Sequence, residues 1–297
     1  MDSTTIRPFT PSISTEVTED LIQRLKQTRL PEAETVEDWS QGVPLSYQSE
    51  LLTYWTHEYD FARLEQRLGA FDNFKTDIDG VEIHFIHKRS PHTAATPLLI
   101  THGWPGSVLE YLDILDALTD PTRHGGTPDD AFHVVLPALP GFGFSGKPRD
   151  AGTGVPKIAT LWETLMGRLN YSEFHAHGGD WGSIITQAIL LQEETSCTAG
   201  HCTLPIVLPD ETTLAEPQPA ELDALESFQF YNDWDSGYSK QQSTRPQTLG
   251  YGLADSPSGQ MAWIVEKFAF WMDCEQSGVR HPENVLSKDQ LLDLSLI

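Results

Sequence analysis

The hydrophobic pattern changes its period within the first 95 residues. Three stretches carry apolar residues at helical spacing, and two short stretches that follow alternate between apolar and polar residues. Asp79-Gly80, between the alternating stretches, is a strong signal for a tight hairpin turn. We therefore expect a helical first region that ends in a β-hairpin. The expected helices are one that begins after Thr15 or Thr18 and stops before Pro31, then 46–59 and 61–68, and the expected strands are 74–78 and 81–86.

From residue 97 onward, short apolar stretches alternate with amphipathic ones. Such βα alternation predicts a mostly parallel sheet with helices on both faces. Ligands bind such sheets at the carboxyl ends of the strands, so residues 102–106 and 177–183 should face one another there. The expected strands are 97–101, 132–137, 173–177 and one near 201–208, and the expected helices are 108–118, 158–169 and one that leaves the turn at 183.

The alternation stops after residue 208, where a helical or irregular stretch rich in proline begins. Helices are expected at 222–234 and 261–271, and the region should form a lid above the strand ends. We therefore divide the chain into a first region at 1–95, an α/β core at 96–208 and a helical lid at 209–297.

The turn between the third core strand and its helix carries the candidate chemistry. Its sequence, His-Gly-Gly-Asp-Trp-Gly-Ser at 177–183, places small residues around one carboxylate, Asp180. Glycines at such a strand-to-helix turn allow a sharp and strained backbone at the tip. Asp180 is therefore a candidate nucleophile, since an ionised carboxylate attacks a saturated carbon without a base and leaves an alkyl ester. The alternative is that Asp180 only caps the helix that follows.

Composition narrows the class of protein. The 297-residue chain has a formal net charge of −24, spread along its length, which argues against a nucleic acid or an anionic membrane as partner. Its three cysteines, Cys197, Cys202 and Cys274, lack the spacing of a metal site and favour a reducing compartment. Residues 1–30 contain no apolar run typical of a signal peptide or membrane anchor. We therefore expect a cytoplasmic protein.

The motifs together resemble one family, the microsomal-type epoxide hydrolases of the α/β-hydrolase fold, which carry an N-terminal meander. The resemblance implies an α/β-hydrolase fold with a helical and hairpin meander and a helical lid. The similar segments run through the whole chain: Arg29-Leu30-Pro31, Asp38-Trp39, Tyr54-Trp55, Tyr59-Asp60, Ile78-Asp79-Gly80, Ile83-His84-Phe85, 102–106, 139–145, 178–183, Ser236-Gly237-Tyr238, 244–253, Asp255-Ser256-Pro257 and 263–268.

The resemblance implies roles for four residues. Asp180 attacks an epoxide carbon, and the backbone N–H groups of Trp104 and Trp181 form an oxyanion hole for its ester carbonyl. Tyr238, in Ser-Gly-Tyr, donates a proton to the alkoxide, although a tyrosine that only packs in the lid is the alternative. Tyr251 is a competitor for that role. The resemblance also implies that the protein uses no cofactor or metal and acts on small apolar epoxides in detoxification. A homodimer is one possible assembly.

The sequence departs from the family at its C-terminal end. The family places a histidine and an orienting acid on loops after the lid, whereas this chain ends in apolar lid-like sequence at 291–297. We therefore expect a truncated fold that lacks the last strands and final helix and leaves an apolar edge of the sheet exposed. We also expect an apolar end left uncovered, because a following segment would normally bury it, and impaired hydrolysis of the ester. His102 and His177 lie near the expected site but not at the family's position for the base.

Two other functions remain open. A haloalkane dehalogenase also carries Asp followed by Trp at this turn, where the Trp indole binds the departing halide. The first region and Tyr238 favour the epoxide. A non-catalytic protein that binds apolar ligands in the lid pocket is the third alternative.

Overall fold

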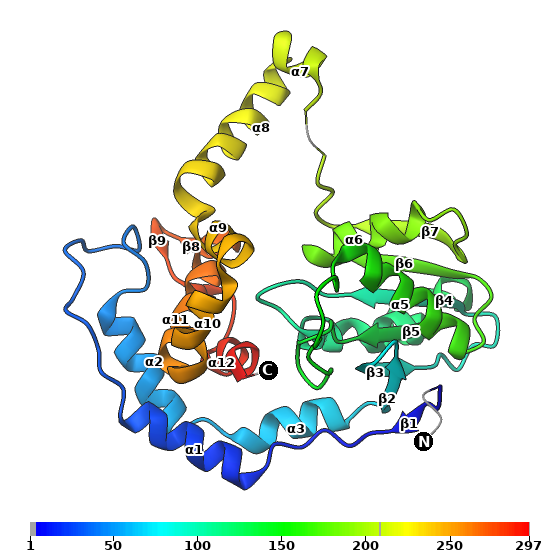
Figure 1. Ribbon diagram of the computed structural model, residues 1–297, viewed down its shortest axis with the longest axis horizontal. Helices are drawn as coiled ribbons and strands as arrows, with labels where there is room; N and C mark the ends of the chain where they lie inside the picture. Colours follow the sequence, from blue (N-terminus) through cyan, green and yellow to red (C-terminus); the bar gives the residue numbers. More distant parts are fainter. Residues whose placement is uncertain (1–3, 208, 297) are drawn as a thin grey trace.

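The computed structural model describes residues 4–207 and 209–296. Its main element is a seven-stranded sheet in the order β1-β2-β3-β5-β4-β6-β7 (Figure 1). Strands β5, β4, β6 and β7 are parallel to one another, and β1, β2 and β3 extend the sheet in antiparallel fashion. The strands are β1 Arg7–Pro8, β2 Asn73–Ile78, β3 Val81–Lys88, β4 Thr96–Thr101, β5 Phe132–Pro137, β6 Phe174–Gly178 and β7 Cys197–Cys202.

The predicted hairpin links the first region to the core. Asp79 and Gly80 both have positive φ, 50° and 79°, as the tightest hairpin turn requires. Strand β3 then pairs with β5 of the parallel part, so the hairpin belongs to the same sheet as the core. The two histidines of β3 are held within the structure, since His84 bonds Asn73 and His87 bonds Tyr171, each at 2.9 Å.

Helices cover both faces of the sheet, as the βα alternation predicts. On one face, α5 (Val155–Arg168) and α6 (Trp181–Leu190) enclose a core around Trp162 and Phe174. On the other face, η1 (Val108–Ile114), α4 (Leu115–Thr119) and α3 (Phe61–Gly69) pack against apolar residues of β4 and β5.

The first and last regions share a third core beside the sheet (Figure 1). Helices α1 (Thr15–Lys26) and α2 (Leu45–His57) pack against α11 (Pro257–Trp271) and α12 (Lys288–Leu296). The expectation of an uncovered apolar end is therefore wrong for Leu291 and Leu292, which α2 and α11 bury fully within the described chain.

The rest of the lid lies above this helical layer, and α8 projects away from it (Figure 1). No residue of α7 or α8 is buried. The remaining elements are α7 Glu211–Ala215, α8 Pro219–Phe230, η4 Tyr231–Asp235, α9 Gly237–Thr244, α10 Pro246–Asp255, β8 Glu275–Gln276, β9 Val279–Arg280 and the short turns η2 Pro121–His124, η3 Pro128–Asp130 and η5 Pro282–Asn284.

Three expected elements differ in detail. Ser14, rather than Thr15 or Thr18, caps α1. The helix ends at Lys26, several residues before Pro31, so the proline does not terminate it. The expected helix at 108–118 is a 3₁₀ helix followed by one short α-helix. The last core strand runs over Cys197–Cys202 rather than 201–208. The sequence did not predict these bounds, because the residues of the strand show no apolar alternation. Gly200 lets Leu190 of α6 pack directly on the strand.

Candidate active site

The turn between β6 and α6 has the strained geometry expected from its glycines. Asp180 stands at its tip with φ 50° and ψ −122°, in a backbone region that few non-glycine residues adopt. A Cβ at Gly178 would overlap the backbone of Gly182, and one at Gly182 would overlap the carbonyl oxygen of Thr101. The Asp180 side chain makes no capping bond to α6, so the alternative of a simple helix cap is not supported.

The carboxylate of Asp180 meets the loop that follows β4. The backbone N–H of Trp104 donates to Oδ1 of Asp180 over 2.8 Å. Parallel pairing of β4 with β6 brings the two loops together, and a Cβ at Gly103 would overlap the Asp180 side chain. The prediction that segments 102–106 and 177–183 face one another is therefore confirmed. The second carboxylate oxygen is left for other contacts.

Trp181, the second predicted oxyanion donor, is the first residue of α6. Its backbone N–H belongs to the open first turn of that helix, beside Asp180. Its side chain is 48% exposed and does not form part of the core. The role of its N–H in an oxyanion hole stays a prediction.

Tyr238 from the lid lies over the same loop. Its ring stacks on that of Trp104, with centroids 5.0 Å apart and planes 9° from parallel. Its hydroxyl is 3.1 Å from that of Tyr231, and burial, followed by this neighbour, raises the pKa of Tyr238. The phenol therefore stays protonated at neutral pH, as a proton donor must. Tyr251, the competitor, is 72% exposed.

A polar cluster that the sequence did not reveal supports Tyr238. Lys267, buried on α11, lies 4.8 Å from the Tyr238 ring centroid and bonds Asp235 at 2.9 Å. The same Asp235 accepts a bond from the Trp271 indole N–H, and Trp271 packs edge-on against Tyr238. The apolar pattern of 261–271 hides this lysine, so only the fold brings the cluster together.

The histidines near the site have other partners. His102 is buried, donates from Nδ1 to the Gly103 carbonyl and accepts at Nε2 from the N–H of Leu139. Burial lowers the pKa of His102 to about 4, so it is neutral and ties two loops together. His177 lies beside His201 on the sheet, with 2.8 Å between their Nδ1 atoms.

Glu110, in the first turn of η1, is a titratable group near the site that sequence reasoning missed. A Cβ at Gly106 would overlap its carboxyl group, so that group lies on the same loop as Trp104. Burial, followed by the charge of Asp180, raises the pKa of Glu110 to about 7, although solvent reaches the side chain. In the sequence, only its position four residues after Gly106 indicated that Glu110 could lie near the site.

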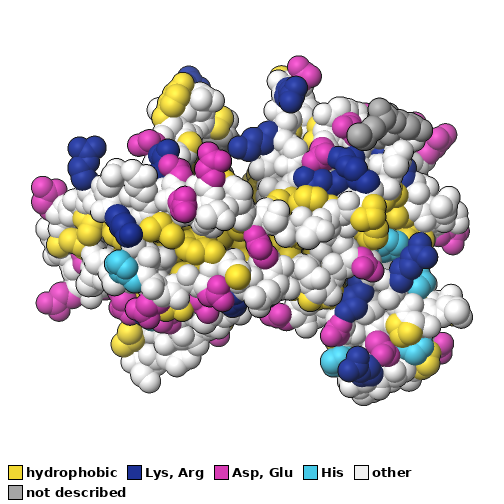
Figure 2. Space-filling model, turned by 90° about the horizontal axis from the view of Figure 1, so that it is seen from below, with side chains coloured by type: hydrophobic (Ala, Val, Ile, Leu, Met, Phe, Trp, Pro, Cys, Tyr) yellow, Lys and Arg dark blue, Asp and Glu magenta, His cyan; other side chains and the backbone are white. Residues whose placement is uncertain are grey.

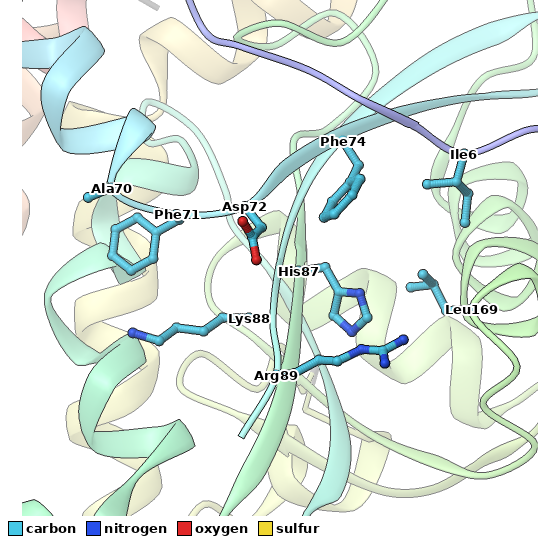
Figure 3. A pocket seen from close by; sticks show the side chains of 9 residues that line it. All are labelled: Ile6, Ala70, Phe71, Asp72, Phe74, His87, Lys88, Arg89 and Leu169. Carbon is cyan, nitrogen blue, oxygen red and sulfur yellow. The ribbon is translucent and has the colours of Figure 1, made fainter. Parts of the chain in front are cut away.

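One cavity lies away from this site. It has a volume of about 510 Å³ beside the end of β3, and Figure 3 shows its lining. Asp72, His87 and Arg89 contribute polar groups between the apolar side chains of Ile6, Phe74 and Leu169. It contains none of the predicted site residues.

The charges on one face and the metal-ligand side chains within the described ranges mark no second site. On the face in Figure 2, acidic and basic side chains are interspersed. Within 4–207 and 209–296, no three His, Cys, Asp or Glu side chains are arranged to hold a metal ion. Among the same residues, no helix has both the length and the apolar character needed to cross a membrane.

Comparison with known proteins identifies the family. The family described as "Epoxide hydrolase N terminus" matches residues 6–111, and "alpha/beta hydrolase fold" matches 96–257. Epoxide hydrolase 1 of Sus scrofa is 34% identical over 98% of this chain and 69% of its own length. The chain belongs to the epoxide hydrolase family of the α/β-hydrolase fold.

Other members of the family agree with this assignment. Epoxide hydrolase 1 of Oryctolagus cuniculus is 33% identical over 93% of this chain, and a Stigmatella aurantiaca protein named for the same family is 49% identical over 97%. The chain spans 65% and 64% of their lengths, respectively. The crystal structure of juvenile hormone epoxide hydrolase from Bombyx mori superposes with a TM-score of 0.88, at 29% identity, over 98% of this chain and 72% of that one.

Proposed function

We propose that this protein is an epoxide hydrolase in which Asp180 opens an epoxide and forms an alkyl ester. The single observation that carries the proposal is the 2.8 Å bond from the Trp104 N–H to Oδ1 of a carboxylate on a strained turn. The names of the relatives point to the same activity.

We assign different roles to the two carboxylate oxygens of Asp180. Oδ1 is held by the Trp104 N–H, so Oδ2 attacks the epoxide carbon and the C–O bond of the ring breaks. The ring oxygen leaves as an alkoxide and takes the phenolic proton of Tyr238. Oδ1 becomes the ester carbonyl, and the N–H groups of Trp104 and Trp181 stabilise its negative charge when water attacks. Losing one such donor typically costs ~10²–10³ in rate.

The finer features belong to the same proposal. A small apolar epoxide suits the aromatic surroundings that the packed rings of Trp104, Tyr238 and Trp271 provide. We infer a cytoplasmic role in detoxification from the acidic composition and the family, with a homodimer as one possible assembly. The proposed boundaries of the three regions remain at 95 and 208.

The test is intact-mass analysis after incubation with styrene oxide, with the diol assayed in the same tube. We expect one equivalent of adduct, diol, or both, and neither with folded Asp180→Asn. Halide release from an alkyl halide without reaction of the epoxide would favour a dehalogenase. Binding of the epoxide without adduct or diol would favour the non-catalytic binder and overturn the proposal.

A further inference from the structure

The carboxyl group of Glu110 has no partner that explains its place beside the nucleophile. It lies against Gly106, two residues after the loop residue whose N–H holds Asp180. Within the described residues, it forms neither a hydrogen bond nor an ion pair with another side chain. Solvent nevertheless reaches it.

The surroundings place Glu110 near the loop that holds the Asp180 carboxylate. The next residue, Tyr111, brings its hydroxyl to 3.4 Å from where a Cβ of Gly179 would stand, so η1 flanks the turn between β6 and α6. Asp180 and Tyr111 are the titratable groups whose charge is coupled to that of Glu110. An unpaired carboxyl group that reaches water next to a nucleophile is suited to binding that water.

We propose that Glu110 is a further catalytic residue, which takes a proton from the water that hydrolyses the ester on Asp180. The water oxygen bonds to the ester carbonyl carbon, and its proton passes to the Glu110 carboxylate. The tetrahedral intermediate expels the diol oxygen, which takes the remaining hydroxyl proton. Asp180 is then a carboxylate again, Glu110 releases its proton to solvent, and the Tyr238 phenolate takes one proton from solvent, so that both groups return to their starting state. This proposal rests on the proposed function of Asp180.

Two causes, burial and then the charge of Asp180, act on the protonation state of Glu110. In the free enzyme, burial and the Asp180 carboxylate raise the pKa of Glu110 to about 7. Esterification removes the negative charge of Asp180 and therefore one of the two causes. The pKa of Glu110 falls, and the group is ionised at neutral pH when a base is needed.

The experiment follows the ester after a single alkylation. The chain is mixed with styrene oxide, the free epoxide is removed, and adduct decay and diol formation are followed by intact mass and chromatography. For Glu110→Gln we expect alkylation within a few-fold of wild type and ester decay ~10²–10⁴ slower. Wild-type decay should also slow as pH falls through the range in which Glu110 titrates, whereas decay in the variant should lack this dependence.

Two variants serve as controls. Glu193→Gln, at an exposed glutamate beyond α6, should decay as wild type does. Glu110→Asp keeps the carboxylate but shortens its reach, and should fall between wild type and Glu110→Gln. If the ester decays at the same rate in wild type and in Glu110→Gln, or persists equally in both, the role of Glu110 is overturned. The proposed function of Asp180 is not affected by that result. Absence of both adduct and diol in folded wild type overturns the function of Asp180 itself.

Discussion

The Trp104 N–H donates to Oδ1 of Asp180 over 2.8 Å, and so the loop after β4 is joined to the tip of the turn after β6. This bond orients the carboxylate before any substrate arrives. Because one oxygen is held, the other is presented to the substrate, and the free-energy cost of orienting the nucleophile is met by the fold.

Asp180→Asn tests the nucleophile with little change of shape. Asn tolerates positive φ almost as well as Asp, so the turn should keep its backbone at φ 50°. Its amide does not displace an epoxide C–O bond, so the adduct with styrene oxide should fall below detection by intact mass. Circular dichroism and the thermal midpoint, both close to wild type, would show that the loss is chemical. An adduct of wild-type yield on this variant would rule out Asp180.

Tyr238→Phe tests the lid phenol. The ring would still stack on Trp104 at 5.0 Å, but the alkoxide would lose its proton donor. We expect adduct formation to slow by ~10²–10⁴, measured as the single-turnover rate. Tyr251→Phe, at a ring 72% exposed, is the matched control and should react as wild type does. Equal rates for all three proteins would leave Tyr238 with a packing role only.

Local periodicity and turn chemistry predicted much of the fold. The change of period before Asp79-Gly80 gave the hairpin, and apolar runs gave β4 and β5, because those signals depend on neighbouring residues. The β7 sequence, Cys-Thr-Ala-Gly-His-Cys, has no such signal, and its pairing with β6 decides its place. Of the candidate site, the sequence placed Asp180 and Trp104 correctly, since parallel strands bring their carboxyl ends to one edge.

The groups that were missed depend on contacts between distant segments. Glu110, Lys267 and Asp293 lie on elements whose pattern indicates only ordinary helices. The groups that act on them come from other segments. Asp235 bonds Lys267 and Arg63 bonds Asp293, whereas the like charge of Asp180 adds to burial in raising the pKa of Glu110. One sequence does not reveal such pairs.

Gly182→Ala tests the close packing between the turn after β6 and the end of β4. A Cβ there would overlap the carbonyl oxygen of Thr101, which is backbone and has little freedom to move. We expect the free energy of unfolding to fall by ~1–3 kcal/mol, measured with urea. Gly252→Ala in α10, where a Cβ would meet nothing within 4 Å, should instead stabilise by ~0.4–1 kcal/mol. Similar effects for both variants would contradict the close approach.

Asp293→Asn tests the ion pairs that hold α12 against α3. The side chain of Asp293 is 1% exposed and accepts from Arg63 at 2.6 Å, Arg67 at 2.8 Å and the Tyr59 hydroxyl at 2.7 Å. Removing its charge leaves two guanidinium groups without their buried partner, and we expect a loss of ~3–5 kcal/mol in urea unfolding.

The control for this change uses the same arginine. Arg67 also lies 3.4 Å from Asp113, whose side chain is 76% exposed, so Asp113→Asn should cost only ~0–1 kcal/mol. Equal losses for the two variants would show that burial of Asp293 contributes nothing.

Three buried histidines predict how stability changes with pH. Burial lowers the pKa values of His84, His87 and His102 to about 4, compared with ~6.5 in an unfolded chain. The unfolded state therefore binds protons first, and the stability present above pH ~6.5 is lost as pH falls toward 4. Most carboxylates protonate below this window. Glu110, whose pKa burial raises to about 7, opposes the effect of one histidine but not of three. The free energy of unfolding, measured in urea from pH 7.5 to 5, should therefore decrease.

His84→Gln identifies the cause of this dependence. Its amide N–H can still donate to Oδ1 of Asn73, as Nε2 of His84 does at 2.9 Å, but it does not titrate. The variant should lose up to ~1.4 kcal/mol per pH unit from the slope, the value for one proton. His57→Gln, at an exposed histidine at the end of α2, should keep the wild-type slope. We expect this contribution because a charged imidazole enclosed by the sheet destabilises the folded state. If His84→Gln also keeps the wild-type slope, protonation of His84 does not contribute to the pH dependence.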